Sequence, residues 1–388
     1  MEHTAVTVLE VGAILLAAAF AGWVARRLTL PAILGYLVVG VAVSRFTPGY
    51  VADPEQVNLF AEVGAILLLF EVGIEVDLGE LRREHPAVLW AAPLQIIVTM
   101  VAAIAGFVAF GLDLSAAALL GLAIAMSSSV VVVNITRSRR RTTDAETEHL
   151  LVGWAVLQDV VGVAIAILLL TMLGAGQPFH LTILGIIAFG ALALASARFL
   201  PYALAGLRNQ PDLFLTVSVA TGLAVAGAGA LFTGIPLALA AFIAGLSITE
   251  GPVSAEARRR LVPFRDLFAI FFFVAIGTLI DPAALLSQGL GWLALSLALV
   301  VVAKSGVIFV LARVSKLPAH PEQLAVGLGQ IGEFGFVLAT VAVARGVLPP
   351  EVYAALLAAV AISIAVSSIL VRYVKRGAGG PAVASADA

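Results

Sequence analysis

The chain is a succession of apolar stretches, each about as long as a helix that crosses a lipid bilayer. Hydrophobic residues make up 61% of its 388 residues and charged residues 12%, against roughly 25% charged in a soluble domain. Because a spanning helix needs roughly 20 apolar residues, the sequence predicts an all-α polytopic membrane protein with about thirteen transmembrane helices. The expected spans are 5–25, 31–46, 58–76, 86–110, 115–135, 149–173, 180–201, 211–228, 234–250, 262–280, 288–313, 322–345 and 350–374.

The basic residues are distributed as the positive-inside rule requires for this number of spans. With the N-terminus outside, 19 of the 22 lysines and arginines fall in cytoplasmic segments, while Arg45 and Arg345 fall outside and Lys304 lies within a span. Since cytoplasmic loops carry the excess of Lys and Arg, we expect an inner-membrane protein with a cytoplasmic C-terminus. Arg26 and Arg27 follow the first apolar stretch instead of preceding it, so this helix is expected to be retained and not cleaved as a signal peptide.

Several classes of function are disfavoured by composition. The chain has no cysteine, which excludes disulfides, thiolate metal sites and cysteine nucleophiles. Its five histidines are scattered near span boundaries without the spacing of a metal site. Nothing indicates nucleic acid, and the expected surroundings are membrane lipid. We also expect no cofactor and no enzymatic activity, because intramembrane hydrolysis would need a second acid or a base in register with Asp159.

Asp159 is the most informative residue for function. It lies with Gln158 in the middle of the apolar stretch 150–170, where a carboxylate costs about 2.5–3.5 kcal/mol on insertion scales. Ala155, Gly162 and Ala166 share its helix face, and small residues let another helix approach closely. The sequence therefore predicts an ion or proton site at Asp159, with Gln158 offering a carbonyl oxygen to the cation. The alternative is a structural Gln–Asp pair that ties two helices together.

Two spans have the composition of interrupted helices. Residues 125–134 place Ser127, Ser128 and Ser129 in the middle of one span, and residues 327–337 place four glycines and Glu333 in the middle of another. Unwound backbone within a membrane is tolerated where it lines a cavity, with half-helix ends facing an ion. For the serines alone, hydrogen bonds to their own helix carbonyls are an equally good interpretation.

The interrupted spans are the fifth and the twelfth, and an offset of seven reverses orientation across the membrane. The fourth and eleventh spans, and the sixth and thirteenth, are related by the same offset. Inverted repeats with discontinuous helices crossing near the midplane are typical of NhaA-like secondary transporters. The sequence therefore predicts this architecture, although the two halves share no convincing sequence identity.

Two further buried charges need partners. Lys304 lies too deep in its span to reach the membrane surface, and a buried cation needs an anion. Asp159 and Glu333 are its candidate partners, in a fixed pair or in one that breaks when substrate binds. Glu71 either lines an inner vestibule or pairs with an arginine on the cytoplasmic side. Glu75 is expected at the membrane interface, facing basic residues of the following loop.

These residues, taken together, resemble the Kef-type branch of the monovalent cation–proton antiporters. The matching segments are LPAILGYLVVGV, FAEVGAILLLFEVGIEVDLGEL, AMSSSVVVV, LQDVVGVAI, FFFVAIGTLID and GQIGEFGFVL, in the family's order, over about residues 1–375. The resemblance implies that Asp159 carries cation and proton in turn, and that Ser127, Ser128 and Ser129 match its Ser-Ser-Thr with serine in place of threonine. It also implies that Lys304 and Glu333 compensate charge.

The resemblance further implies a homodimer in which a dimerisation part and a mobile core are interleaved within a transport domain of residues 1–376. The core is expected to include about 86–173 and 288–374, and residues 377–388 to form a short disordered cytoplasmic tail. Kef proteins proper carry a cytoplasmic nucleotide-binding domain after the last helix. Since none follows here, a separate cytoplasmic regulatory subunit is a possible partner.

The expected function is exchange of a monovalent cation for H⁺ by alternating access. K⁺ is favoured, because the related sodium-exchanging branch commonly has two adjacent acids where this chain has Gln158 and Asp159. A Na⁺/H⁺ antiporter of the same fold is the first alternative. A cation channel would need repeated rings of carbonyls or acids, and a Na⁺-coupled organic anion symporter would need a wider polar cavity.

Overall fold

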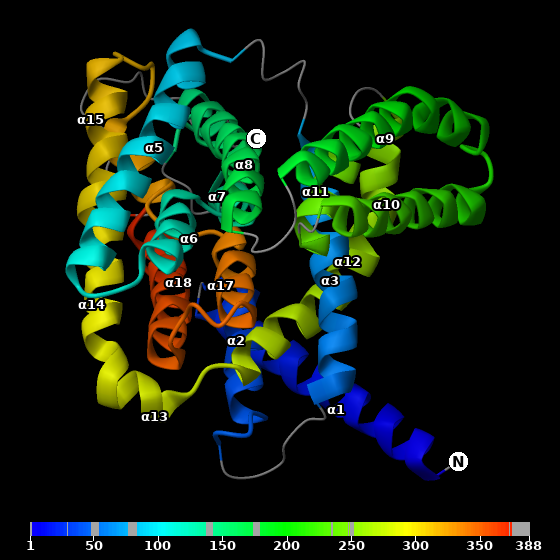
Figure 1. Cartoon of the computed structure of the whole chain (residues 1–388), viewed down its shortest axis with the longest axis horizontal. Helices are drawn as coiled ribbons and strands as arrows, with labels where there is room; N and C mark the ends of the chain where they lie inside the picture. Colours follow the sequence, from blue (N-terminus) through cyan, green and yellow to red (C-terminus); the bar gives the residue numbers. More distant parts are fainter. Residues whose placement is uncertain are drawn as a thin grey trace, which may run out of the picture.

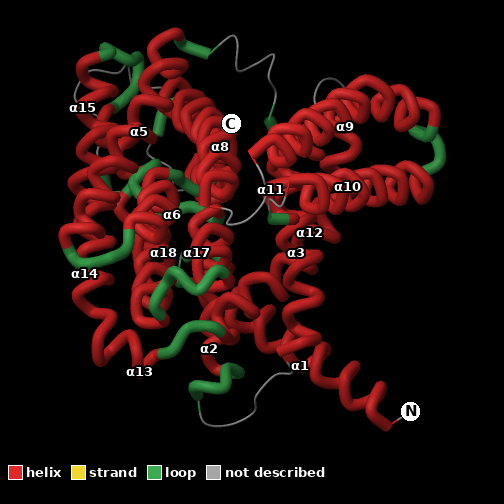
Figure 2. The backbone as a smooth tube through the Cα atoms, in the orientation of Figure 1, coloured by secondary structure: helices red, strands yellow, loops and turns green. Residues whose placement is uncertain are grey.

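The chain is all-helical in its computed structural model, which describes residues 2–28, 30–47, 54–76, 84–136, 143–173, 179–233, 236–246, 248, 252–371 and 373–374. Every regular element in these ranges is a helix (Figure 2). The first six are α1 (Glu2–Arg27), α2 (Ala32–Ala42), α3 (Pro54–Glu75), α5 (Pro86–Ala109), α6 (Leu114–Ala125) and α7 (Ser129–Thr136). The next five are α8 (Ala145–Leu173), α9 (Phe179–Gly206), α10 (Pro211–Thr233), α11 (Leu237–Leu246) and α12 (Pro252–Thr278).

The last part of the chain contains one long composite helix and three more helices. The composite helix joins α13 (Pro282–Ala284), η1 (Leu285–Gly289), α14 (Leu290–Leu299), η2 (Val300–Ser305) and α15 (Gly306–Val314), in which η1 and η2 are π-helical. It is followed by α16 (Pro321–Gly327), α17 (Phe334–Ala344) and α18 (Pro350–Leu370). Lys304 lies in η2, and π-helical segments within α-helices often occur at functional sites.

Each range expected to span the membrane contains a helix or two half-helices. Eight helices are long and apolar enough to cross a bilayer, and α2, α6, α11 and α17 are shorter apolar helices. The two interruptions predicted from serine and glycine are present as the gap between α6 and α7 and the gap between α16 and α17. The all-helical fold with two discontinuous helices is therefore confirmed, while the number of spans stays a prediction.

The helices form two groups that lie side by side in Figure 1. One group contains α5 to α8 and α13 to α18, and the other contains α3 and α9 to α12, with α1 and α2 below. Aromatic contacts from α17 join the groups, with Phe334 against Phe242 of α11 and Phe336 against Phe273 of α12, at ring-centroid distances of 5.9 and 5.8 Å. Whether the groups act as a mobile core and a dimerisation part stays a prediction.

Two glycine crossings repeat the same geometry in the second group. Gly40 of α2 lies against Gly277 of α12, and Gly245 of α11 lies against Gly73 of α3. In each case a Cβ atom on one glycine would collide with the partner glycine's Cα and with the carbonyl three residues before it. The predicted offset of seven spans relates α2 to α11 and α3 to α12. The crossing of α2 with α12 is therefore repeated by the crossing of α11 with α3, as an inverted repeat predicts.

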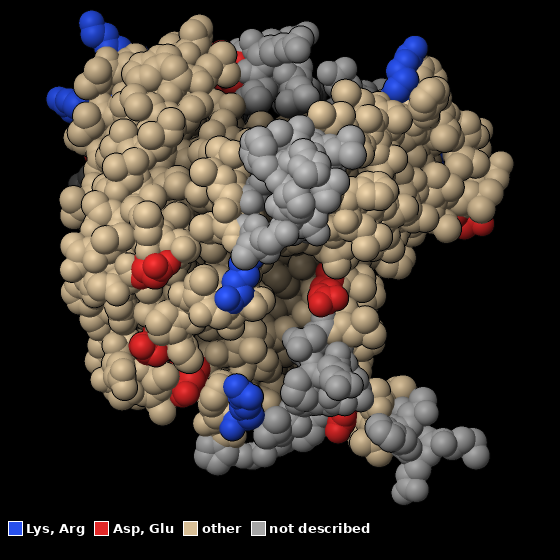
Figure 3. Space-filling model, in the orientation of Figure 1, with Lys and Arg blue, Asp and Glu red and all other residues tan. Residues whose placement is uncertain are grey.

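The surface is apolar over wide areas, as helices facing lipid require. Figure 3 shows few Lys, Arg, Asp or Glu side chains on one face of the molecule. Large apolar side chains are exposed instead, among them Leu16 and Met172, each 75% exposed, and Leu231 at 86%. Several polar side chains are instead buried near the breaks of the interrupted helices, among them Ser127, Asp159 and Lys304.

Candidate ion-binding site

The site is built around two interrupted helices that cross at their breaks. After α6 the backbone becomes extended at Met126 (φ −89°, ψ 141°), and the amide of Gly332 donates to the Met126 carbonyl at 3.0 Å. A Cβ atom on Gly332 would lie 2.6 Å from the carbonyl group of Ser127. Glycine is therefore required here so that the two breaks can touch backbone to backbone.

The serines and Gln330 satisfy backbone groups that the breaks expose. Ser127 Oγ donates to the Leu328 carbonyl at 2.7 Å. The amide of Ser128 donates to Gln330 Oε1 at 2.9 Å, and Gln330 Nε2 returns a hydrogen bond to the Ser128 carbonyl at 3.3 Å. An unpaired backbone group at this depth would cost several kcal/mol. Ser127 and Ser128 thus hold the crossing together, and the Ser127 hydroxyl bonds the other interrupted helix, not a carbonyl of its own helix.

Lys304 completes the crossing from the composite helix. Its side chain is fully buried, and Nζ donates to the carbonyls of Met126 at 2.7 Å and Gln330 at 2.6 Å. Each carbonyl belongs to one of the two breaks, where the negative ends of the half-helices collect. The expected direct pair with Asp159 or Glu333 is not formed: Lys304 makes no salt bridge to any described carboxylate. The cation is held by helix-end carbonyls instead.

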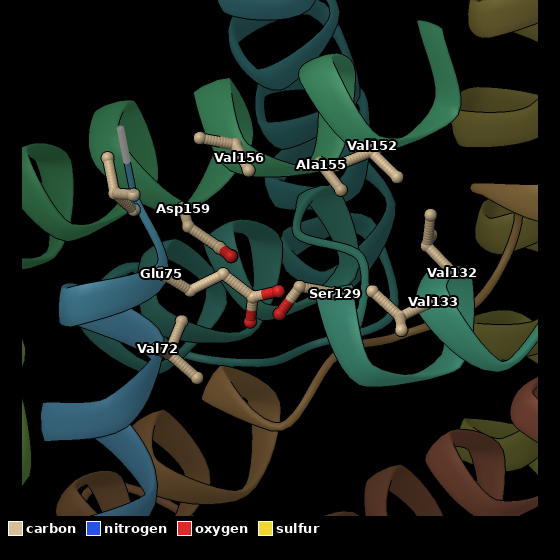
Figure 4. Close-up of a pocket in the computed structure, with 10 residues that line it drawn as sticks. Val72, Glu75, Ser129, Val132, Val133, Val152, Ala155, Val156 and Asp159 are labelled. Atoms are coloured by element: carbon tan, nitrogen blue, oxygen red, sulfur yellow. The ribbon is translucent and has the colours of Figure 1, made fainter. Parts of the chain in front are cut away.

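Asp159 faces a small pocket next to this crossing. It comes from α8 and is 1% exposed, and neither carboxylate oxygen has a hydrogen-bond partner among the described residues. The pocket is otherwise lined mainly by valines of α3, α7 and α8, with polar groups from Ser129 and Glu75. Figure 4 shows the polar ends of Asp159, Glu75 and Ser129 pointing toward one another. A buried carboxylate without a donor is a strong site for a proton or a cation.

The small-residue face predicted beside Asp159 packs as expected. Gly162, one turn further along α8, lies so close to Met126 that a Cβ atom would come within 2.5 Å of its side chain. Ala155, one turn before, lines the pocket. The face therefore brings Asp159 against the break after α6 and away from lipid.

Ser129 is the one serine of the three that lines the pocket. Its hydroxyl donates to Glu333 Oε1 at 3.3 Å, and Glu333, at the start of α17, is 4% exposed. The structure therefore brings Asp159, Ser129 and Glu333 into one neighbourhood, while Ser127 and Ser128 face the crossing. The roles of these residues in ion binding stay predictions.

Gln158 does not face the pocket, contrary to the expectation that it offers a carbonyl oxygen to the cation. Its Oε1 accepts from the amide of Ser127 at 3.2 Å, and its Nε2 donates to Gln95 of α5. Both ends of the side chain are thus occupied, and Gln158 is fully buried. The adjacent residues Gln158 and Asp159 point to different sides of α8, as a helix with 3.6 residues per turn requires.

Glu71 and Glu75 form an ion-pair cluster with two arginines of α12. Arg258 contacts Glu71 at 2.7 Å and Glu75 at 2.6 Å, and Arg265 contacts Glu71 at 2.7 Å. Of the two interpretations of Glu71, the structure shows pairing with arginines, and Glu71 is not among the pocket-lining residues.

Glu75 lines the pocket, and the sequence reasoning missed it. The sequence predicts it at the membrane interface, facing Arg82 and Arg83, which lie outside the described residues. Glu75 follows Glu71 by four positions, which places both on one face of α3. The direction in which the two glutamates face depends on their ion pairs with arginines of α12, almost two hundred residues later in the sequence.

Comparisons with known proteins give the family of this chain. The family described as sodium/hydrogen exchanger, transmembrane, matches residues 15–375. The chain belongs to this family. It is a cation/proton antiporter homologue and not an enzyme, and it lies in a membrane.

Two curated relatives place it in the Kef-type branch. The chain is 32% identical to the putative cation/proton antiporter YbaL of Escherichia coli K12 over 389 aligned positions, which cover 95% of this chain and 69% of YbaL. It is 30% identical to the glutathione-regulated potassium-efflux system protein KefC of Enterobacter sp. strain 638, covering 89% of this chain but only 57% of KefC. The resemblance found in the motifs is thereby confirmed.

A solved structure confirms the architecture. The sodium proton antiporter MjNhaP1 from Methanocaldococcus jannaschii, determined at pH 8, superposes with a TM-score of 0.64. The match covers 96% of this chain and 99% of that chain, at 17% sequence identity. At this identity the likeness concerns the fold alone, which is that of the antiporters with crossed discontinuous helices.

Proposed function

We propose that this protein exchanges K⁺ for H⁺ by alternating access, with Asp159 as the site that the two ions share. The observation that carries the proposal is the buried Asp159 carboxylate, which faces a pocket and whose oxygens accept no hydrogen bond from any described residue. A cation or a proton would neutralise its charge, and a neutral site crosses a low-dielectric region far more cheaply than a charged one. Obligatory exchange follows, because the uncompensated carboxylate disfavours movement of the unloaded protein.

The preference for K⁺ is supported by the Gln158–Asp159 pair and by the likeness to a potassium-efflux protein. Na⁺ is the alternative cation, supported by the sodium antiporter that shares the fold. Stoichiometry depends on Lys304. If Lys304 stays protonated throughout, one cation exchanges for one proton and transport is electroneutral. We propose that it does, because its ammonium group is held by two carbonyls of the crossing.

The transport part is proposed to include a core of residues 86–173 and 288–374 that moves against the remaining helices of a homodimer. The orientation proposed is N-terminus outside and C-terminus cytoplasmic, in the inner membrane. A separate cytoplasmic regulatory subunit stays a possible partner.

The test is cation-driven proton movement in liposomes that contain a trapped pH dye, with wild type, Asp159→Asn and the control Asp212→Asn. Asp212 lies in the exposed first turn of α10. We expect K⁺ to drive proton efflux in wild type and control, and Asp159→Asn to abolish it. Equal flux in Asp159→Asn would reject the shared site. Cation flux without any counter-ion would indicate a channel, and flux that requires an organic anion would indicate a symporter.

A further inference from the structure

A buried chain of hydrogen bonds starts at Gln158 and leads away from the pocket. The Ser127 amide donates to Gln158 Oε1, Gln158 Nε2 donates to Gln95 Oε1, and Gln95 Nε2 donates to Thr99 Oγ1 at 3.1 Å. Thr99 Oγ1 then donates to the carbonyl of Ala303 at 2.9 Å. Gln95, Thr99 and Gln158 are all 0% exposed. This series of hydrogen bonds therefore connects Gln158, the residue before Asp159, to Ala303, the residue before Lys304.

The direction of every bond in this chain is fixed by its ends. A backbone amide such as that of Ser127 can only donate, and a backbone carbonyl such as that of Ala303 can only accept. Gln95 meets two more one-way partners, since Trp154 Nε1 donates to its oxygen at 3.4 Å and the Ala125 carbonyl accepts from its nitrogen at 3.2 Å. The amide groups of Gln95 and Gln158 consequently have one possible orientation each.

Gln95 is the hub of this network. Its oxygen accepts from two donors and its nitrogen donates to two acceptors, so all of its hydrogen-bonding capacity is used. One of these acceptors is the last carbonyl of α6, directly before the break that Lys304 and Gly332 complete. Gln95 contacts no pocket-lining residue by these bonds. Of its four partners, Gln158 is the one adjacent to Asp159 in sequence, so the route considered runs through Gln158.

We propose that Gln95 is a positioning residue for cation recognition at Asp159. By occupying the amide of Gln158, it keeps the Gln158 carbonyl oxygen out of the pocket and fixes the rotation of α8 that presents Asp159. The cation is then recognised by carboxylate and hydroxyl oxygens only. Releasing Gln158 would let a neutral amide oxygen enter the ion's coordination shell, and this would change the relative binding of K⁺ and Na⁺. The proposal rests on the shared site at Asp159.

The decisive variant is Gln95→Met, which keeps the length of the side chain and removes all four hydrogen bonds. Apparent KM values for K⁺ and Na⁺ are measured separately in liposomes at one pH. We expect the ratio of the two KM values to change by at least about threefold, with a smaller effect on maximal rate. The control is Ser367→Ala, which removes one buried helix–helix bond, from Ser367 Oγ to the Val326 carbonyl at 2.7 Å. It should lower stability without changing the ratio.

A second comparison separates positioning from loss of structure. If Gln95 acts through Gln158, the double variant Gln95→Met/Gln158→Met should have the same KM ratio as Gln158→Met alone. If Gln95→Met changes the KM ratio further in the presence of Gln158→Met, the two residues act independently and the proposal is contradicted. If Gln95→Met does not fold, the milder Gln95→Asn keeps an amide but shortens the side chain by one methylene, so that it no longer reaches Gln158 Nε2, and it should shift the ratio in the same direction.

An unchanged ratio in Gln95→Met, with exchange still abolished in Asp159→Asn, would reject the role of Gln95 alone. Exchange that survives Asp159→Asn would reject the shared site itself. The two failures are therefore distinguishable.

Discussion

The buried polar side chains are of two kinds: some stabilise the crossing of the interrupted helices, and others line the Asp159 pocket. Ser127 and Ser129 are two residues apart and illustrate the division. Ser127 bonds the opposite backbone, whereas Ser129 lines the pocket beside Asp159. The same residue type therefore carries two different functions, and substitution should separate them.

Ser127→Ala should lower stability and Ser129→Ala should weaken cation binding. Ser127→Ala leaves the buried Leu328 carbonyl without its 2.7 Å partner, which costs about 1–3 kcal/mol. Ser129→Ala removes a hydroxyl from the pocket, and we expect a rise of about threefold in cation KM. Thermal unfolding in detergent and liposome exchange are measured on both. The reverse pattern would contradict the assignment.

Glu75→Gln should raise the apparent KM for the cation without abolishing exchange. The carboxylate lines the Asp159 pocket and is also held by Arg258 at 2.6 Å, so part of its charge is already compensated. We expect a rise of about threefold to tenfold, or ~0.7–1.4 kcal/mol, that decreases at high ionic strength. Glu322→Gln, at an exposed position in α16, is the control for removing one negative charge. A loss as complete as that in Asp159→Asn would mean that Glu75 shares the site fully.

The sequence alone singles out Asp159, the residue proposed to bind the ions, but it does not give the direction in which its neighbours point. Asp159 stands out because a carboxylate amid apolar residues has no structural purpose in a helix. Lys304 stands out equally, yet its partners are backbone carbonyls, which every residue carries and which leave no sequence signal. Gln158 is turned away by Gln95, a residue sixty-odd positions earlier that reads as an ordinary polar side chain in a long helix.

At the scale of elements, prediction succeeded where length and apolar composition decide. All ranges expected to span contain helices, and both interruptions fall where serine or glycine clusters weaken the helix. The inverted repeat could be inferred only from the order of interrupted spans. Its physical counterpart, the paired crossings of Gly40 with Gly277 and Gly73 with Gly245, becomes visible in three dimensions because single glycines are common in membrane helices.

Gly277→Ala should destabilise the protein through this crossing. The new methyl group would overlap the Leu37 carbonyl and lie 2.8 Å from the Cα of Gly40, so α2 must move away from α12. Overpacking of this kind costs about 1–3 kcal/mol. Gly12→Ala is the matched control, since a Cβ atom there meets nothing within 4 Å. Comparable melting temperatures for the two variants would show that the crossing tolerates a wider separation.

At the scale of the whole molecule, the proposed exchange requires that the two helix groups move against each other. The contacts between them are side-chain contacts, such as the edge-to-face pairs of α17 with α11 and α12. The hydrogen bonds that fix the broken helices, by contrast, lie within one group. One group can therefore carry the crossing and Asp159, while α3 of the other group contributes Glu75 to the pocket; movement between the groups would then change the surroundings of Asp159, as alternating access needs.

If exchange requires the two helix groups to move against each other, a covalent link between them should stop exchange. The chain has no cysteine, so the double variant Phe242→Cys/Phe334→Cys carries only the two thiols introduced where the rings are 5.9 Å apart. Treatment with a short bifunctional thiol reagent containing a cleavable disulfide should abolish K⁺-driven proton efflux, and reduction should restore it. Phe110→Cys/Trp292→Cys is the control, because its 4.9 Å ring pair joins α5 and α14 inside one group. Exchange that continues at full rate in the first variant after complete cross-linking would show that transport does not require movement between α11 and α17. Inhibition of both variants alike would instead mean that the reagent acts by rigidifying the protein as a whole.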